Sequence, residues 1–187
     1  MNPGDPRRLV GKRFWGYLVA LCFVVQPSLA QQKLNRLIVY GENFIFSVKE
    51  PTGWNGDTTN AEKFQCNLVL HESGRAPDST EGLIRIRVND KVDENTRADL
   101  EADMDDYKAK YPTVHFRDIP AKNPNYRCLA SVFYIPGKFY EYVAYVNPGP
   151  QKPLLFSVSM NTYKSQASAK QLEAFQSAIQ SLTLLKP

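Results

Sequence analysis

Short stretches of apolar or alternating residues predict β-strands along most of the chain. Leu37–Tyr40 and the alternating segment 44–49 predict a strand pair that is broken at Gly41. The other expected strands are 66–71, 83–88, 126–135, 138–146 and 154–160. A proline-glycine turn joins 126–135 to 138–146, so these two segments form a hairpin. Strands joined by such short turns pair antiparallel, because a parallel connection needs about a dozen residues or more.

Two other segments show helical spacing. Apolar residues recur at intervals of three and four between 93 and 111 and again between 167 and 184, so each series falls on one side of a helix. Thr96 is the expected N-cap of the first helix, and Pro112 ends it. The two apolar stripes are Leu100, Met104, Tyr107 and Tyr111, and Leu172, Phe175, Ile179 and Leu182. Each stripe must cover a sheet face, which predicts an α+β fold, a mainly antiparallel β-sheet with helices packed on it.

The segment PTGWNG at 51–56 predicts a turn around Trp54, because proline and glycine favour reversals. Asp57 or Thr58 can cap a short helix that ends near Phe64. The sequence contains no internal repeat and no low-complexity tract, so one domain accounts for this order of elements.

The first thirty residues have the three parts of a cleavable export signal. Basic residues are followed by the apolar run Phe14–Val25 and by small residues at Ser28 and Ala30. The run has twelve residues, whereas a permanent membrane span needs about 20, which disfavours an uncleaved anchor. Lipidation at Cys22 is disfavoured because the bulky Leu21 precedes it. We therefore expect a signal peptide over 1–30, cleaved after Ala30.

The processed chain, residues 31–187, has the length of a single domain. The signal peptide carries four basic residues and one acidic residue, so the processed chain retains 19 Lys and Arg against 18 Asp and Glu. This balance gives no indication of nucleic-acid binding, which needs a strong basic excess. We expect a periplasmic or secreted protein with no integral membrane span after cleavage.

Four features together resemble the PsbP/Mog1/DcrB-like family over nearly all of Leu37 to Leu184. They are FIFSVKEPTGW, the helix ADLEADMDDYKAKYP, a tyrosine-rich hairpin and the terminal SAIQSL. The resemblance implies an antiparallel sheet between helices, an α/β/α sandwich. Members of this family include a photosystem accessory subunit, a Ran-binding factor and a bacterial envelope protein, and they share no catalytic motif. The resemblance therefore implies a fold and no particular activity.

The spacing of the cysteine and histidine residues does not match a catalytic or metal-binding motif. Cys66 and Cys128 remain after processing, and an exported pair can form a disulfide if the two Cα atoms approach within about 7 Å. Either cysteine can instead be a buried free thiol. His71 and His115 are isolated from metal-spaced partners, so no zinc site and no cofactor are expected. A nucleophilic pair of Cys66 and His71 is disfavoured, since a separation of five places them on opposite faces of a regular strand.

The segment from Asp90 to Asp106 contains eight carboxylates but lacks the EF-hand order and its glycine. Asp99, Asp103 and Asp106 lie on one side of the predicted helix, away from its apolar stripe. We therefore expect these three carboxylates on a solvated helix face.

The predicted hairpin carries more tyrosines than the other segments, and these are the residues that best indicate a binding surface. Tyr140 and Tyr142 share one strand face, and either core packing or a partner-binding surface that includes Trp54 would explain them. We favour a non-catalytic exported accessory or binding protein whose partner is an envelope or extracellular protein. The alternative is a hydrolase or small-ligand enzyme whose site is assembled from separate segments, with His71, His115 and carboxylates as its acid-base groups.

Overall fold

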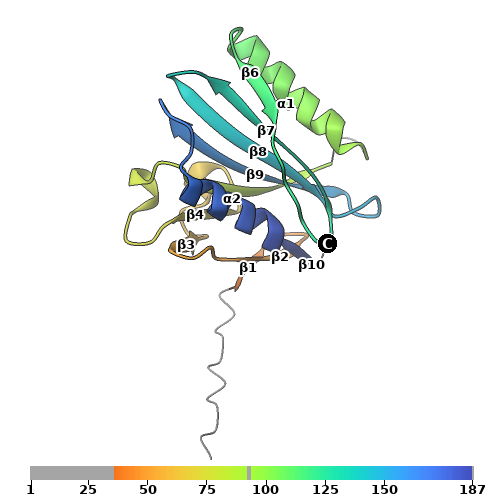
Figure 1. The fold of residues 1–187 in the computed structure, drawn as a ribbon. Helices are drawn as coiled ribbons and strands as arrows, with labels where there is room; N and C mark the ends of the chain where they lie inside the picture. The colour runs from red at the N-terminus through yellow and green to blue at the C-terminus, as the bar shows by residue number, and fades with distance from the viewer. Residues whose placement is uncertain (1–35, 92–93, 187) are drawn as a thin grey trace, which may run out of the picture. The chain divides into compact units, whose positions relative to one another are not determined.

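The computed structural model describes residues 36–91 and 94–186, which form two antiparallel sheets and two α-helices (Figure 1). The predicted signal peptide, residues 1–30, lies outside the described residues. The larger sheet has seven strands in the order β3-β4-β5-β9-β8-β7-β6. These strands are β3 (Trp54–Asp57), β4 (Leu68–Glu72), β5 (Ile84–Asp90), β6 (His115–Asp118), β7 (Arg127–Ile135), β8 (Phe139–Asn147) and β9 (Leu154–Tyr163). Every pairing in it is antiparallel, as the short connections predict.

A smaller sheet has the order β1-β2-β10 and joins the two ends of the described chain. Its strands are β1 (Arg36–Tyr40), β2 (Ile45–Lys49) and β10 (Thr183–Lys186). Phe46 on β2 is fully buried, and its ring meets that of Phe156 on β9 at 5.4 Å, edge to face. The inner face of the small sheet therefore shares one hydrophobic core with the large sheet.

The two α-helices cover opposite faces of the large sheet, as the sequence pattern predicts. Helix α1 (Thr96–Lys110) packs on β7 and β8 through a cluster that includes Leu100 and Phe133. Helix α2 (Ala169–Ser181) buries Phe175 and Ile179 against the other face. The α+β class and the α/β/α sandwich are confirmed. In the described part of the chain, neither helix is both long and apolar enough to cross a bilayer.

Some local elements differ from the sequence prediction. The turn around Trp54 is shorter than expected, because the chain enters β3 at Trp54 itself and pairs with β4. The predicted short helix is one 3-10 turn, Glu62–Phe64, and a second such turn lies at Pro77–Ser79. Asn95 caps α1 in place of Thr96, because the Asn95 side chain accepts a hydrogen bond from the Arg97 backbone N–H.

The predicted disulfide between Cys66 and Cys128 is corrected by the structure, in which both residues are free thiols. Cys66 immediately precedes β4, whereas Cys128 lies on β7, and three strands separate β4 from β7 in the sheet. At about 4.8 Å per strand, the two positions are roughly 19 Å apart, far beyond the reach of a disulfide.

The free thiols give a direct prediction. We expect thiol labelling of the processed protein, unfolded without reductant, to modify both cysteines and to add two labels by mass. A protein that takes up no label until it is reduced would contradict the strand order between β4 and β7.

Candidate functional site

A polar cleft of about 310 Å³ lies beside α1, over the part of the large sheet that the helix leaves open. We call it the α1 cleft. Its floor is formed by β5 and β9, one wall by α1, and part of the opposite side by Cys66. Its lining includes Arg85 and Arg87 on β5, Ser157 and Ser159 on β9, Glu141 and Tyr145 on β8, and Asp99, Ala102, Asp103 and Tyr107 on α1.

Strand alternation explains why the floor is polar. On β9, Phe156 and Val158 point into the core on the α2 side, so Ser157 lies on the α1 side. The same alternation on β5 buries Ile86 and places Arg85 on the α1 side. Helix α1 packs mainly on β7 and β8, and on β9 only Leu155 belongs to its hydrophobic cluster, so β5 and the rest of β9 lie beside the helix. Polar side chains on two adjacent central strands therefore line a hollow and not a packed layer.

A hydrogen-bonded network centred on Glu141 forms part of the lining of the cleft. Arg85 on β5 donates from Nη2 to Oε1 of Glu141 at 2.9 Å, and the two side chains are 28% and 18% exposed. The hydroxyl of Tyr107 donates to the other carboxylate oxygen. Burial, followed by the charge of Glu141, raises the pKa of Tyr107, so its phenol stays protonated.

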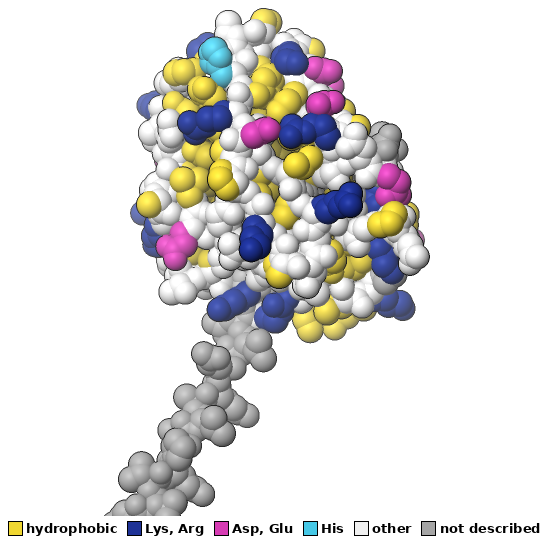
Figure 2. All heavy atoms as spheres, turned by 45° about the vertical axis from the view of Figure 1, so that its right-hand side comes forward, with side chains coloured by type: hydrophobic (Ala, Val, Ile, Leu, Met, Phe, Trp, Pro, Cys, Tyr) yellow, Lys and Arg dark blue, Asp and Glu magenta, His cyan; other side chains and the backbone are white. Residues whose placement is uncertain are grey.

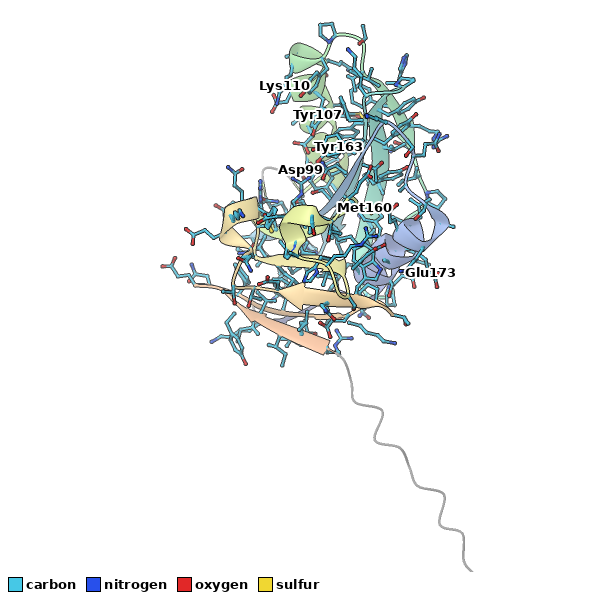
Figure 3. The ribbon with its side chains drawn as sticks, turned by 90° about the vertical axis from the view of Figure 1, so that its left-hand side faces the viewer. Asp99, Tyr107, Lys110, Met160, Tyr163 and Glu173 are labelled. Carbon is cyan, nitrogen blue, oxygen red and sulfur yellow. The ribbon has the colours of Figure 1, made fainter. Side chains whose placement is uncertain are left out.

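A second pair lies on the wall of the cleft. The hydroxyl of Tyr145 donates to Oδ2 of Asp103, and burial raises the pKa of that tyrosine, with the Asp103 carboxylate adding to the shift. Asp99, one helical turn earlier, is only 8% exposed (Figure 3). The expectation of a solvated helix face is therefore wrong for Asp99 and Asp103. Asp106 is exposed, as expected.

Asp103 gives a pH-dependent prediction. Burial raises the pKa of Asp103 above its ordinary 3.8, partly opposed by the hydrogen bond from Tyr145. The folded state thus holds this proton more tightly than the unfolded chain, and stability is lost as pH rises from about 3.8 through the higher folded pKa. Asp103→Asn removes that loss. We expect the free energy of unfolding of the native protein to fall relative to the variant over this window. If the difference in free energy of unfolding between the native protein and Asp103→Asn did not change with pH, the burial assigned to Asp103 would be contradicted.

Cys66 borders the cleft as a protonated thiol. Burial raises its pKa, with a smaller opposing effect from Arg85. Its Sγ lies 3.4 Å from the backbone oxygens of Ala61 and Leu68, which accept the weak S–H hydrogen bond. A thiol held in this state is a poor nucleophile, since the thiolate is the reactive form.

The two histidines lie away from the α1 cleft. His71 is half-buried on β4, and its Nδ1 lies 3.2 Å from the backbone oxygen of Glu72. His115 is exposed on β6, where its ring packs on Tyr134 at 5.4 Å. The structure therefore does not bring either histidine together with the carboxylates of the cleft.

The aromatic residues proposed for partner binding are mostly core residues. Trp54 and Tyr142 are each 3% exposed, and the Tyr142 hydroxyl accepts the backbone N–H of Ala167 at 3.1 Å. Both side chains point into the core between the large sheet, the small sheet and α2. This burial corrects their assignment to a partner-binding surface. Tyr140 is half-buried and stacks on Tyr134, with ring centroids 5.6 Å apart.

Sequence reasoning missed the serines and Glu141 and assigned no role to the arginines. The available signal was the alternation on two segments: Arg85 and Arg87 alternate with isoleucines, and Ser157 and Ser159 alternate with Phe156, Val158 and Met160. A polar face on two strands fits solvent exposure or a polar hollow equally well. Only the strand order β5-β9-β8 distinguishes them, because it places both polar faces beside each other at the centre of the sheet.

The geometry defines this protein as an α+β sandwich with a polar cleft beside one helix. No protein-family model matches the chain, and no curated protein matches it. The structure is similar to the solution structure of cyanobacterial PsbP (CyanoP) from Synechocystis sp. PCC 6803. The TM-score is 0.47 and the identity 10%, over 86% of this chain and 98% of that chain.

Proposed function

We propose that this chain is an exported, non-catalytic binding protein that holds a small zwitterionic ligand, such as an α-amino acid, in the α1 cleft. A cavity of about 310 Å³ is at the lower end of the range for small-molecule sites. Guanidinium groups, carboxylates and hydroxyls line the cleft beside the apolar Val143 and Leu155, which favours a ligand with charged groups on a small apolar frame.

The separation of charges across the cleft carries this proposal. Guanidinium groups come from the β5 side at Arg85 and Arg87, and carboxylates come from the α1 side at Asp99 and Asp103. The Arg85 Nε is buried and has no hydrogen-bond partner among the described residues. A ligand carboxylate can accept from Arg85, which favours planar acceptors, while a ligand ammonium lies against the carboxylates of α1. Two opposite charges on one small molecule fit this arrangement.

The states of the titratable groups support binding without catalysis. Tyr107 and Tyr145 both have pKa values raised by burial, and each hydroxyl donates to a carboxylate. The Cys66 thiol is also held protonated. A general base or a nucleophile should instead have a pKa brought toward the working pH. Each tyrosine hydroxyl donates its single hydrogen to a carboxylate, so these pairs hold the Glu141 and Asp103 side chains in place in the lining of the cleft.

Export is part of the proposal and has its own test. We expect the mature protein, expressed in a bacterial host, to be recovered from the periplasm or the medium with Gln31 as its N-terminus. Intact-mass measurement decides this. A membrane-bound product that retains residues before Ala30 would contradict cleavage and favour an uncleaved anchor.

Thermal unfolding of the processed protein tests the ligand class. Each of the common L-α-amino acids is added separately, and any that raises the melting temperature is compared with its two single-charge analogues. For alanine these analogues are ethylamine and propionate. We expect stabilisation by at least one amino acid and none by its analogues, since each analogue leaves one side of the cleft uncompensated. Stabilisation by no amino acid, or equally by a single-charge analogue, would contradict the proposal.

A further inference from the structure

We propose that the outer face of the three-stranded sheet β1-β2-β10 docks on a bilayer surface that carries anionic lipid. This outer face consists of Arg36, Ile38, Tyr40, Ile45, Ser47, Lys49, Thr183, Leu185 and Lys186. It does not use the α1 cleft, and the proposal does not depend on a ligand there.

Exposed hydrophobic side chains concentrate on this face. Ile38 is 50% exposed, Tyr40 73% and Leu185 53%, and these are three of the four large hydrophobic side chains exposed among the described residues. The fourth, Tyr163, lies at the end of β9, away from the small sheet (Figure 3). Single exposed apolar residues are ordinary on a protein surface, but a cluster on one sheet face indicates an interaction site.

The register of the strands places these residues together. Ile38 is paired with Ser47 and Tyr40 with Ile45, so side chains of the same face lie next to each other across β1 and β2. The alternate residues, among them Val39 and Phe46, point into the core. Leu185 stands in the irregular register between Leu184 and Lys186, where a bulge leaves it outside the core.

The charged residues on this face all have the same sign. Arg36, Lys49 and Lys186 stand at its outward positions, and none of these positions on the three strands is Asp or Glu. Glu42 lies beyond it, in the turn between β1 and β2. Figure 2 shows Lys and Arg beside exposed hydrophobic side chains at the end of the domain where the small sheet lies.

The chemistry of these side chains favours a lipid surface. Tyrosine combines an apolar ring with a polar hydroxyl and is enriched at membrane interfaces, and Ile38 and Leu185 supply shallow apolar contacts. Basic residues near an anionic bilayer each add to the attraction. Arg36 is held flat across the sheet by the Ser47 Oγ at 2.7 Å and the Ser181 backbone oxygen at 2.8 Å. The apolar side chains are therefore presented on a rigid, cationic sheet surface.

Vesicle co-sedimentation tests the proposal with the processed protein. We expect binding to vesicles of equal parts phosphatidylglycerol and phosphatidylcholine, reduced by salt, and no binding to phosphatidylcholine alone. The double variant Lys49→Gln, Lys186→Gln should weaken binding about fivefold for each charge removed. The triple variant Ile38→Ser, Tyr40→Ser, Leu185→Ser should weaken it by at least about tenfold.

A matched control separates this face from general surface properties. The double variant Tyr163→Ser, Lys138→Gln removes one exposed aromatic and one exposed cation elsewhere and should leave vesicle binding unchanged. Absence of binding to anionic vesicles, or equal losses in the control, would overturn the proposal. A dimer that forms without vesicles and is lost in the triple variant would also overturn it, and would assign the face to a second copy of the chain.

Discussion

Replacing Phe175 by alanine is expected to lower the free energy of unfolding by about 3 to 5 kcal/mol. The Phe175 side chain is fully buried on α2, and its ring meets the edge of Tyr142 at 6.3 Å. It lies in the core shared by both sheets, where the surrounding strands cannot close over the missing ring. The expected effect therefore includes a cavity term besides the loss of apolar burial.

Denaturant unfolding followed by circular dichroism measures this change. Glu173→Ala is the matched control, because Glu173 is exposed on the same helix (Figure 3) and its removal should change stability by less than about 0.5 kcal/mol. Similar midpoints for Phe175→Ala and Glu173→Ala would show that the buried face of α2 is assigned wrongly.

Removing the Glu141 carboxylate should also lower the free energy of unfolding by a large amount. Glu141→Ala leaves the Arg85 guanidinium and the Tyr107 hydroxyl without their acceptor. Removing one member of a buried ion pair typically costs 3 to 5 kcal/mol. Because the Arg85 and Glu141 side chains are 28% and 18% exposed, solvent reduces the expected loss of stability to about 2 to 4 kcal/mol.

The exposed ion pair between Arg97 and Asp118 provides the control. Its side chains are 40% and 60% exposed, with an N–O distance of 3.3 Å, so Asp118→Ala should change stability by no more than about 1 kcal/mol. Equal effects for Glu141→Ala and Asp118→Ala, measured by denaturant unfolding, would mean that the cleft network is as solvated as a surface pair.

Hydrophobic periodicity was enough to predict the layers of this fold. The stripe that includes Leu172 and Phe175 specified the buried side of α2, and the glycine turn at 136–138 specified the β7–β8 hairpin. The short strands β3, β6 and β10 were not predicted. Each has only four residues, too few for an alternation to be recognised, and each depends on pairing with another strand: β3 with β4, β6 with β7, and β10 with β2.

The candidate site was harder to predict because its residues are ordinary in isolation. Asp99 and Asp103 occupy helix positions that a sequence pattern assigns to solvent. Their burial arises because α1 is displaced toward β7 and β8, which turns this side of the helix over the open strands β5 and β9. Trp54 and Tyr142 were misassigned for the opposite reason, since both sheets and α2 enclose them in one core. In both cases the burial of the side chains depends on how the helices and sheets pack together, which the sequence pattern of one element does not reveal.

Isothermal titration of two tryptophan variants tests the ligand site most directly. Ala102 is exposed at the α1 wall of the cleft, whereas Ala109 is exposed on the same helix and does not line it. For an amino acid that stabilises the processed protein, Ala102→Trp should fill the cleft and abolish measurable binding, while Ala109→Trp should bind with unchanged affinity. Undiminished binding in a folded Ala102→Trp protein would contradict the assignment of the α1 cleft as the binding site.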